Sequence, residues 1–230
     1  MVHVVIAGAG PTGLTAAILL QRLGVGTRVV DRIAEPGRLA KAMVLWSRSL
    51  EILAEAGVAE EAVRIGTPLA SARYVDAGRT VAAIVTDRIP GTRWMPVILP
   101  QNRLEELLRD RYEALGGAVE WSTEVVGATE RFDGVTVELA GADGLTTRTK
   151  ADYLLGCDGI RSAVRTAAGI PWEEGPQYEE VFQLGDVTMD TPLERTAAHH
   201  FLGRAGVSVA LPMPDGLWRV VGYLDGKEPE

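Results

Sequence analysis

A glycine-rich turn near the start of the chain is the feature that most constrains its fold. Gly8-Ala9-Gly10-Pro11-Thr12-Gly13 matches the pattern G-x-G-x-x-G and lies between two apolar segments, residues 2–7 and 14–23. The first segment is rich in β-branched residues and predicts a buried strand, and the second predicts a helix packed on a sheet. The sequence therefore predicts a Rossmann-like βαβ unit that starts at residue 2 and binds a dinucleotide at its first turn.

The spacing of the glycines in this turn suits a bound diphosphate. Gly8 permits a tight turn, Gly10 lets the backbone approach a pyrophosphate, and Gly13 allows close contact between helix and strand. A helix start also offers free N–H groups and a positive charge of about half a unit. The candidate cofactor-binding residues here are Gly8, Gly10, Pro11, Thr12 and Gly13, and a βα turn without a ligand is the alternative.

An acidic residue follows the next predicted strand, residues 27–30. Asp31 lies where a carboxylate accepts hydrogen bonds from the ribose hydroxyls of an adenosine, an arrangement that NAD and FAD share. Arg32 is also a candidate, either beside the adenine or simply exposed to solvent. The first motif therefore predicts a dinucleotide without distinguishing the two cofactors.

The composition argues against several classes of function. A formal net charge of −8 argues against a nucleic-acid partner, which needs a basic surface. No apolar run approaches the roughly 20 residues that span a bilayer, and the first residues lack the regions of a signal peptide. The single cysteine, Cys157, can form neither an intrachain disulfide nor a thiolate metal cluster. We therefore expect a cytoplasmic protein without a metal site.

The hydrophobic pattern changes along the chain from alternating strands and helices to strands alone. After a loop over residues 32–47, a helix is expected with Leu50 and Leu53 on its apolar face. A second helix is expected over residues 102–115, where Asn102-x-x-Glu105 resembles a capping box. A hairpin is expected over 71–87, and further strands over 118–128, 134–139, 145–149, 151–157, 181–189, 198–203, 207–211 and 218–224.

A second motif, Gly156-Cys157-Asp158-Gly159-Ile160-Arg161-Ser162, places a carboxylate between a buried strand and a helix. Asp158 can accept hydrogen bonds from ligand hydroxyls, while Arg161 and Arg165 supply positive charge. Alternatively, Asp158 caps the helix that starts at Ser162. The spacing alone leaves both interpretations open.

Four motifs in order resemble the FAD-dependent aromatic-ring hydroxylases, which include p-hydroxybenzoate, phenol and polyketide-tailoring hydroxylases. They are G-A-G-P-T-G, Arg48 within W-S-R-S-L-E-I-L, Gln101 within P-Q-N-R-L-E-E-L-L, and G-C-D-G-I-R-S-A-V-R. The resemblance runs from residue 1 to about residue 225. It implies that Arg48 and Gln101 contact the pyrophosphate and ribityl regions of FAD. It further implies that Lys41, Ala42 and Met43 lie along the cofactor. Asp158 is implied to take part in binding both FAD and NADPH, and Val125 is a further cofactor-binding candidate.

The resemblance also implies a fold and an activity. The fold is α/β, with a Rossmann-like FAD-binding domain of the glutathione-reductase type over residues 1–175 and a partial β-sheet substrate domain over 176–230. The hairpin region 71–100 belongs to or lies near the substrate domain. The implied enzyme is a monooxygenase that uses NAD(P)H and dioxygen, through a flavin hydroperoxide, to hydroxylate a small aromatic substrate, phenolic or polyketide-like. The cofactor supplies the chemistry, so no catalytic residue is named.

Several alternatives stay open. Another flavoprotein of this fold, such as a halogenase or a prenyl reductase, shares these motifs. An NAD(P)-dependent dehydrogenase would use the first motif alone, and a non-catalytic nucleotide-binding fragment would need no more. The substrate, the choice between NADH and NADPH, and the oligomeric state are not predicted.

One part of the family pattern is missing. The later G-D-A-A-H motif, which binds the ribityl chain, does not occur, and the chain ends just after a predicted strand, so we expect the natural protein to be longer. Gly185-Asp186 is no substitute because it lies within a predicted strand. His199 and His200 are adjacent on a strand and point to opposite faces, which favours a structural role over a metal site. Trp46, Trp94 and Trp218 are expected in the core or lining a cavity.

Overall fold

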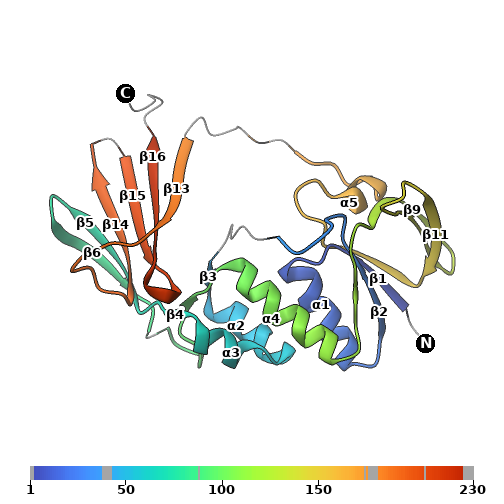
Figure 1. The fold of residues 1–230 in the computed structure, drawn as a ribbon, viewed down its shortest axis with the longest axis horizontal. Coiled ribbons are helices and arrows are strands. Elements are labelled where there is room, and N and C mark those ends of the chain that lie inside the picture. Colours follow the sequence, from blue (N-terminus) through green and yellow to red (C-terminus); the bar gives the residue numbers. More distant parts are fainter. Residues whose placement is uncertain are drawn as a thin grey trace. The chain divides into compact units, whose positions relative to one another are not determined.

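The computed structural model describes residues 3–37, 43–87, 89–173, 175, 181–204 and 206–224. The chain divides into two compact units, coloured by sequence in Figure 1. The first unit comprises Met1–Lys41, Glu55–Val58 and Gln101–Glu173, and the second comprises Ala42–Ala54, Ala59–Pro100 and Glu174–Glu230. The residue boundaries of an FAD-binding and a substrate domain stay a prediction. Of the helices in the described ranges, none is long and apolar enough to cross a bilayer.

A four-stranded parallel sheet forms the centre of the first unit. Its strand order is β12-β1-β2-β8, with bounds Tyr153–Gly156, His3–Ala7, Gly26–Val30 and Val119–Glu120. Ala7 pairs in register with Val30 on one side and Gly156 on the other. The carboxyl ends of the three strands therefore meet at one edge of the sheet, which is where ligands bind in open α/β folds.

Three helices belong wholly to the first unit: α1 (Pro11–Arg22), α4 (Gln101–Ala114) and α5 (Ala163–Ala167). α1 and α4 pack against each other, as Figure 1 shows. The buried face of α4 carries Leu104, Leu108 and Tyr112 at helical spacing. The predicted capping box is wrong, because α4 already begins at Gln101 and Asn102 lies inside the first turn.

A three-stranded antiparallel sheet completes the first unit, in the order β11-β10-β9. The strands span Thr146–Ala151, Gly134–Ala140 and Glu124–Arg131. Its apolar side chains form one core with those of the parallel sheet: Val5, Ala7, Val30, Val125, Val137, Leu139 and Ala151.

The single strand predicted over residues 118–128 is wrong. It is two strands, β8 and β9, separated by a turn in which Ser122 has a φ of 52°. A residue in this left-handed conformation interrupts a strand. The apolar alternation continues across the break, so the pattern alone could not show it.

The second unit contains a six-stranded sheet in the order β13-β16-β15-β14-β5-β6. The expected hairpin over 71–87 forms β5 (Ser71–Asp76) and β6 (Arg79–Val85), joined by a turn at Ala77 and Gly78. β5 pairs in parallel with β14, and all other neighbours are antiparallel. The remaining strands agree with the predicted ones: β13 (Val181–Val187), β14 (Ala197–Gly203), β15 (Gly206–Pro212) and β16 (Trp218–Leu224).

Shorter elements make up the rest of the second unit. The helix expected after residue 47 is in fact two, α2 (Ser47–Ala56), whose last two residues fall in the first unit, and α3 (Ala59–Ile65). The positive φ of 81° at Gly57 allows the break between them. A small antiparallel sheet is formed by β3 (Val44–Leu45), β7 (Val97–Ile98) and β4 (Thr67–Pro68), and η1 (Pro214–Gly216) precedes β16. The expected loop over residues 32–47 is therefore interrupted by β3.

Candidate functional site

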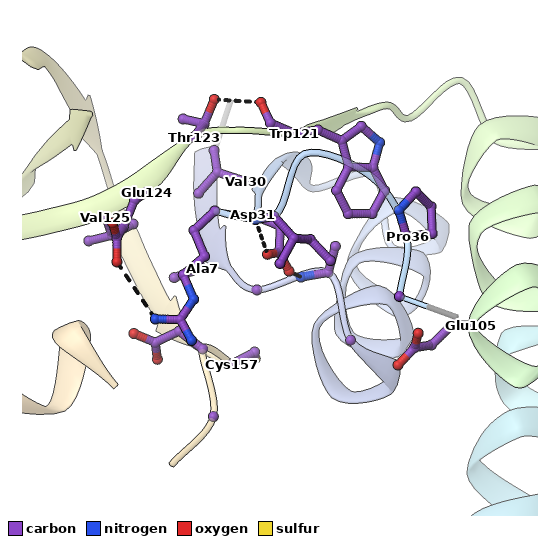
Figure 2. Close-up of a pocket in the computed structure, with 18 of the residues that line it drawn as sticks. Ala7, Val30, Asp31, Pro36, Glu105, Trp121, Thr123, Glu124, Val125 and Cys157 are labelled. Carbon is purple, nitrogen blue, oxygen red and sulfur yellow. Dashed lines mark hydrogen bonds and ion pairs between the residues drawn. The ribbon is translucent and has the colours of Figure 1, made fainter. Parts of the chain in front are cut away.

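A pocket of about 360 Å³ lies at the carboxyl edge of the parallel sheet in the first unit, within the size range of small-molecule sites. Figure 2 shows it from close by. Seven of the predicted cofactor-binding residues line it: Gly8, Gly10, Asp31, Arg32, Gln101, Val125 and Asp158. Residues up to 156 positions apart in the sequence are thus brought to one cavity (163 − 7 for Ala7 and Ala163).

The three glycines of the first motif play different physical parts. A Cβ on Gly8 would lie 2.3 Å from the carbonyl oxygen of Cys157, and one on Gly13 would lie 1.9 Å from that of Gly8. Gly8 also has a φ of 102°, which side-chain-bearing residues rarely adopt. A Cβ on Gly10, by contrast, would meet nothing within 4 Å. Gly8 and Gly13 are therefore required by the fold, whereas Gly10 faces open space.

The start of α1 follows directly on this turn. Gly10 is the N-cap residue and no side-chain hydrogen bond caps the helix. Pro11 has no N–H, and Leu14 N donates to Gly10 O at 3.0 Å. The N–H groups of Thr12 and Gly13 are the first donors of the helix, and such groups attract an anion. Among the described residues, Pro11, Thr12 and Gly13 do not line the pocket itself.

Asp31 connects the glycine turn to the end of β2. One carboxylate oxygen accepts a hydrogen bond from Ala9 N at 2.7 Å, and the other accepts one from Ile33 N at 3.1 Å. The contact to Ala9 is one of the dashed lines in Figure 2. Each carboxylate oxygen has a second lone pair. Asp31 therefore orders the turn and keeps accepting capacity on the pocket.

Asp158 caps α5, which is the second of the two interpretations that the sequence left open. One of its oxygens accepts from Ser162 Oγ at 2.5 Å, and the other accepts from Ala163 N at 2.7 Å and Val164 N at 3.2 Å. Ser162 in turn accepts from Arg165 N at 3.0 Å. Asp158 lines the pocket as well, and its role toward a ligand stays a prediction.

The thiol of Cys157 lies beside Asp158 in the pocket lining. Burial, and secondarily the charge of Asp158, raises the pKa of this thiol above its ordinary value. The cysteine is therefore kept in its neutral form and is a poor nucleophile.

One face of α4 borders the pocket. Gln101, Glu105 and Arg109 follow each other at intervals of four residues and all line the cavity. Gln101 Nε2 donates to Glu105 Oε1 at 2.8 Å. Arg109 is half-buried and has no hydrogen bond or ion pair within the described part of the chain. This face places an amide, a carboxylate and a guanidinium along the pocket.

The part of the pocket beyond Asp31 has a different lining. Arg32 Nη1 lies 3.8 Å from Glu124 Oε1, a weak and exposed ion pair. Arg32 is therefore paired and still lines the pocket. Val125, in β9, is buried and belongs to the core of the first unit. Trp121 and Pro36 line the pocket opposite these residues (Figure 2).

Comparison with known proteins identifies the family. The family model described as FAD binding domain matches residues 1–215. The chain belongs to the FAD binding domain family. The dinucleotide predicted from the first motif is therefore FAD, as the four motifs together implied.

Individual relatives of this FAD-binding chain are named as monooxygenases. It is 34% identical to 6-methylpretetramide 4-monooxygenase of Streptomyces rimosus, over 99% of the chain and 42% of that protein. It is 30% identical to pentachlorophenol 4-monooxygenase of Sphingobium chlorophenolicum, over 95% of the chain and 41% of that protein. The flavin-dependent monooxygenase PieE, solved with FAD and substrate, matches with a TM-score of 0.85 at 25% identity, over 100% of the chain and 44% of that protein. The chain thus spans less than half the length of these relatives.

The pocket fits the adenosine diphosphate part of FAD. The uncapped start of α1 provides amide donors for a diphosphate. The open space over Gly10 allows the diphosphate to approach the backbone. The Asp31 carboxylate is an acceptor of the kind that ribose hydroxyls need.

The other predicted cofactor-binding residues do not belong to this pocket in the described structure. Met43 and Arg48 are in the second unit. Met43 is buried in a core with Leu69, Ile98, Ala198 and Met213, and Arg48 donates to Glu51 Oε2 at 2.8 Å. Lys41 and Ala42 lie outside the described residues.

Residues that the sequence marked as structural are indeed engaged within the second unit. His199 is buried, its Nε2 lies 3.0 Å from Glu194 O, and its ring lies 6.0 Å from that of Trp218. His200 stacks on Tyr74 with a centroid distance of 4.7 Å. Asp186 pairs with Arg219 in β16, so Gly185-Asp186 is part of the sheet.

Trp218 is a core residue, whereas Trp46 is 52% exposed. Trp94 carries the guanidinium of Arg93 over its ring, at 4.5 Å. Of the three tryptophans considered from the sequence, only Trp218 is therefore part of the core.

The pocket-lining residues that sequence reasoning missed include Pro36, Glu105, Arg109 and Trp121. A signal existed for two of them, because Glu105 and Arg109 continue the helical row that starts at Gln101. Trp121 and Pro36 follow no periodic pattern, and only the fold brings them to the cavity.

Proposed function

We propose that this chain supplies the adenosine-diphosphate site of an FAD-dependent monooxygenase that hydroxylates an aromatic substrate with NAD(P)H and dioxygen. The observation that carries the proposal is that Asp31 and Gly10, the N-cap residue of the uncapped helix α1, line one pocket, with open space over Gly10. The names of the relatives support the reaction class.

Each part of the dinucleotide has a proposed partner. The diphosphate lies at the amides of Thr12 and Gly13, and the Asp31 carboxylate accepts from the ribose hydroxyls. The adenine lies beyond the ribose, in the part of the pocket that Arg32 and Val125 border on one side. The lining of the pocket supports this order, because it continues from Gly10 past Asp31 to these two residues.

The riboflavin side is proposed from the family resemblance. Gln101 at the start of α4 contacts the ribityl chain, and its amide can donate and accept. Arg48, Met43, Lys41 and Ala42 stay proposed cofactor contacts on the basis of the family resemblance alone. Asp158 is proposed to act mainly through α5, whose first turn it caps.

When bound, FAD supplies redox chemistry that no side chain of the protein can perform. In the proposed reaction, an aromatic C–H, dioxygen, NAD(P)H and a proton give a phenol, NAD(P)⁺ and water. NAD(P)H provides the two electrons, one oxygen atom enters the ring and the other leaves as water. The residues of this chain bind and orient the cofactor, and none is assigned a nucleophilic role.

The proposal is tested by titrating the purified chain with FAD and with ADP, using calorimetry. We expect both to bind, and Asp31→Asn to weaken ADP binding by about tenfold or more, as for a hydrogen bond to a charged group. Asp152→Asn is the matched control, because Asp152 also accepts from a backbone amide, His3 N, at 2.6 Å but does not line the pocket. Failure of the unaltered chain to bind either ligand would contradict the proposal.

The reaction itself is tested by oxygen uptake. A phenolic substrate should stimulate NAD(P)H oxidation and oxygen consumption in equal amounts, with a hydroxylated product. Chloride-dependent formation of a chlorinated product would instead indicate a halogenase.

A further inference from the structure

We propose that Trp121 is the stacking surface for the adenine of the bound dinucleotide and thereby sets the affinity of this half of the site. This inference rests on the proposed function and adds a residue to it. Trp121 is the one aromatic side chain among the described residues that line the pocket. It is half-buried, so its ring contacts the protein and is still accessible from the cavity.

The backbone holds Trp121 firmly beside the proposed ribose site. The residue before it, Glu120, accepts from Asp31 N at 3.0 Å. The residues after it, Ser122 and Thr123, donate to Ile33 O and Asp31 O, both at 2.9 Å. Hydrogen bonds on both sides of Trp121 therefore tie its turn to the segment that carries the ribose-binding carboxylate.

The side-chain hydroxyl of Thr123 strengthens the turn. Thr123 Oγ1 donates to Trp121 O at 3.1 Å, which is one of the dashed lines in Figure 2. Ser122 adopts a φ of 52°, so the chain turns sharply immediately after the indole. The position of the ring is thus set by the local backbone.

The direction of the dinucleotide leads toward this ring. With the diphosphate at the start of α1 and the ribose at Asp31, the base extends away from the glycine turn. Beyond Asp31, Pro36 and Trp121 line one side of the pocket, opposite Glu124 and Val125. Figure 2 shows the indole of Trp121 pointing toward the ring of Pro36 at this part of the pocket. A flat purine is stabilised most by the face of an aromatic ring.

The experiment uses ADP, which lacks the isoalloxazine ring and so reports on the adenine half alone. Stacking of a purine on an indole quenches its fluorescence. We expect ADP to quench the tryptophan emission of the unaltered chain, and we expect most of this quenching to be absent in Trp121→Phe. Because phenylalanine keeps a ring for stacking, Trp121→Phe should still bind ADP within about threefold of the unaltered chain. Trp121→Ala should weaken ADP binding by about tenfold or more. Its affinity for inorganic pyrophosphate, which has no base, should not change.

Trp172→Phe is the matched control. Trp172 belongs to the same unit, is 58% exposed and lies against Arg165, but it does not line the pocket. Its replacement should leave both the quenching and the affinity unchanged. Because phenylalanine keeps an aromatic ring at this position, the quenching in Trp121→Phe decides the question even if Trp121→Ala fails to fold.

Two results would overturn the inference, and they differ in what they say of the proposed function. If ADP binds Trp121→Ala as tightly as the unaltered chain and still quenches Trp121→Phe, the adenine does not stack on Trp121, while the diphosphate and ribose sites stand. If the unaltered chain binds neither ADP nor FAD, the proposed function fails and the stacking role fails with it.

Discussion

Two groups of polar residues, one in each unit of the protein, are used in opposite ways. In the second unit, the buried guanidinium of Arg219 is paired within the sheet: it donates to both oxygens of Asp186, at 2.7 and 2.8 Å, and Arg219 is 5% exposed. Arg195 donates to three backbone carbonyls at the turn before β16. In the first unit, the amides at the start of α1 and the guanidinium of Arg109 have no partner within the described part of the chain.

Polar groups that pair within the protein stabilise its fold, whereas polar groups without a partner at a cavity are available to bind a ligand. A ligand that binds only the folded protein stabilises it, so a site with free donors beside a cavity is stabilised when a ligand accepts from them. The sheet of the second unit gains no such stabilisation from a nucleotide at the pocket. Substitutions of pocket-lining residues in the first unit should therefore change binding, and those within the six-stranded sheet of the second unit should change stability alone.

The largest effect is expected at Gly13. In Gly13→Ala the added methyl would lie 1.9 Å from the Gly8 carbonyl oxygen, so helix and turn must separate. We expect a loss of about 3 kcal/mol in the free energy of unfolding, measured with urea, together with loss of ADP binding. An unchanged midpoint would show that the turn is not packed as described.

A smaller loss of stability is expected at Asp186. Asp186→Asn leaves the buried Arg219 guanidinium with a neutral partner, which should cost about 2 kcal/mol in the same unfolding experiment. The affinity for ADP should be unaltered when measured below the unfolding transition. A parallel loss of affinity would mean that the two units are not independent in the way their polar groups suggest.

Gly10 provides the converse case. In Gly10→Ala the methyl would meet no atom of the described protein, and the φ of −73° suits alanine. We expect the free energy of unfolding of the ligand-free protein to stay the same while ADP binding weakens by about tenfold, because the methyl occupies the space of the diphosphate. Unchanged affinity would place the diphosphate elsewhere.

The smallest expected effect is the change in stability at acidic pH. The Arg219 guanidinium, by hydrogen bonding and then by charge, lowers the pKa of Asp186 below its ordinary value of 3.8. The pair therefore stabilises the protein above about pH 4 and loses this contribution as the pH falls through the lowered pKa of the folded state. Because the carboxylate is 36% exposed, solvent screening keeps the change below about 1 kcal/mol. The stability difference between the unaltered chain and Asp186→Asn should shrink between pH 5 and pH 3, and a constant difference would contradict this origin.

Local chemistry made some of the site predictable from the sequence. The glycine turn and Asp31 depend on backbone constraints within one βαβ unit, and the sequence identifies both. The strands over 181–224 show alternation along each strand, and their positions are confirmed. The role of Asp158 could not be decided from the sequence, because helix capping and ligand binding require the same carboxylate at the same place.

Tertiary placement was not predictable. Arg109 enters the site because α4 turns one face toward the pocket, and this orientation follows from packing against α1. Trp121 was hidden in what looked like one strand, since the left-handed Ser122 leaves no signature in the hydrophobic pattern. The capping box at Asn102 failed because the helix began one residue earlier, at Gln101.

The role of the α1 amides can be observed directly by following backbone amide resonances of the isotope-labelled chain during titration with ADP. The account predicts the largest shifts at Ala9, Gly10, Thr12 and Gly13, with smaller ones at Asp31 and at the Trp121 indole. Resonances that stay in place at these residues while those of β14 or β16 move would contradict it, because the diphosphate would then bind away from the glycine turn.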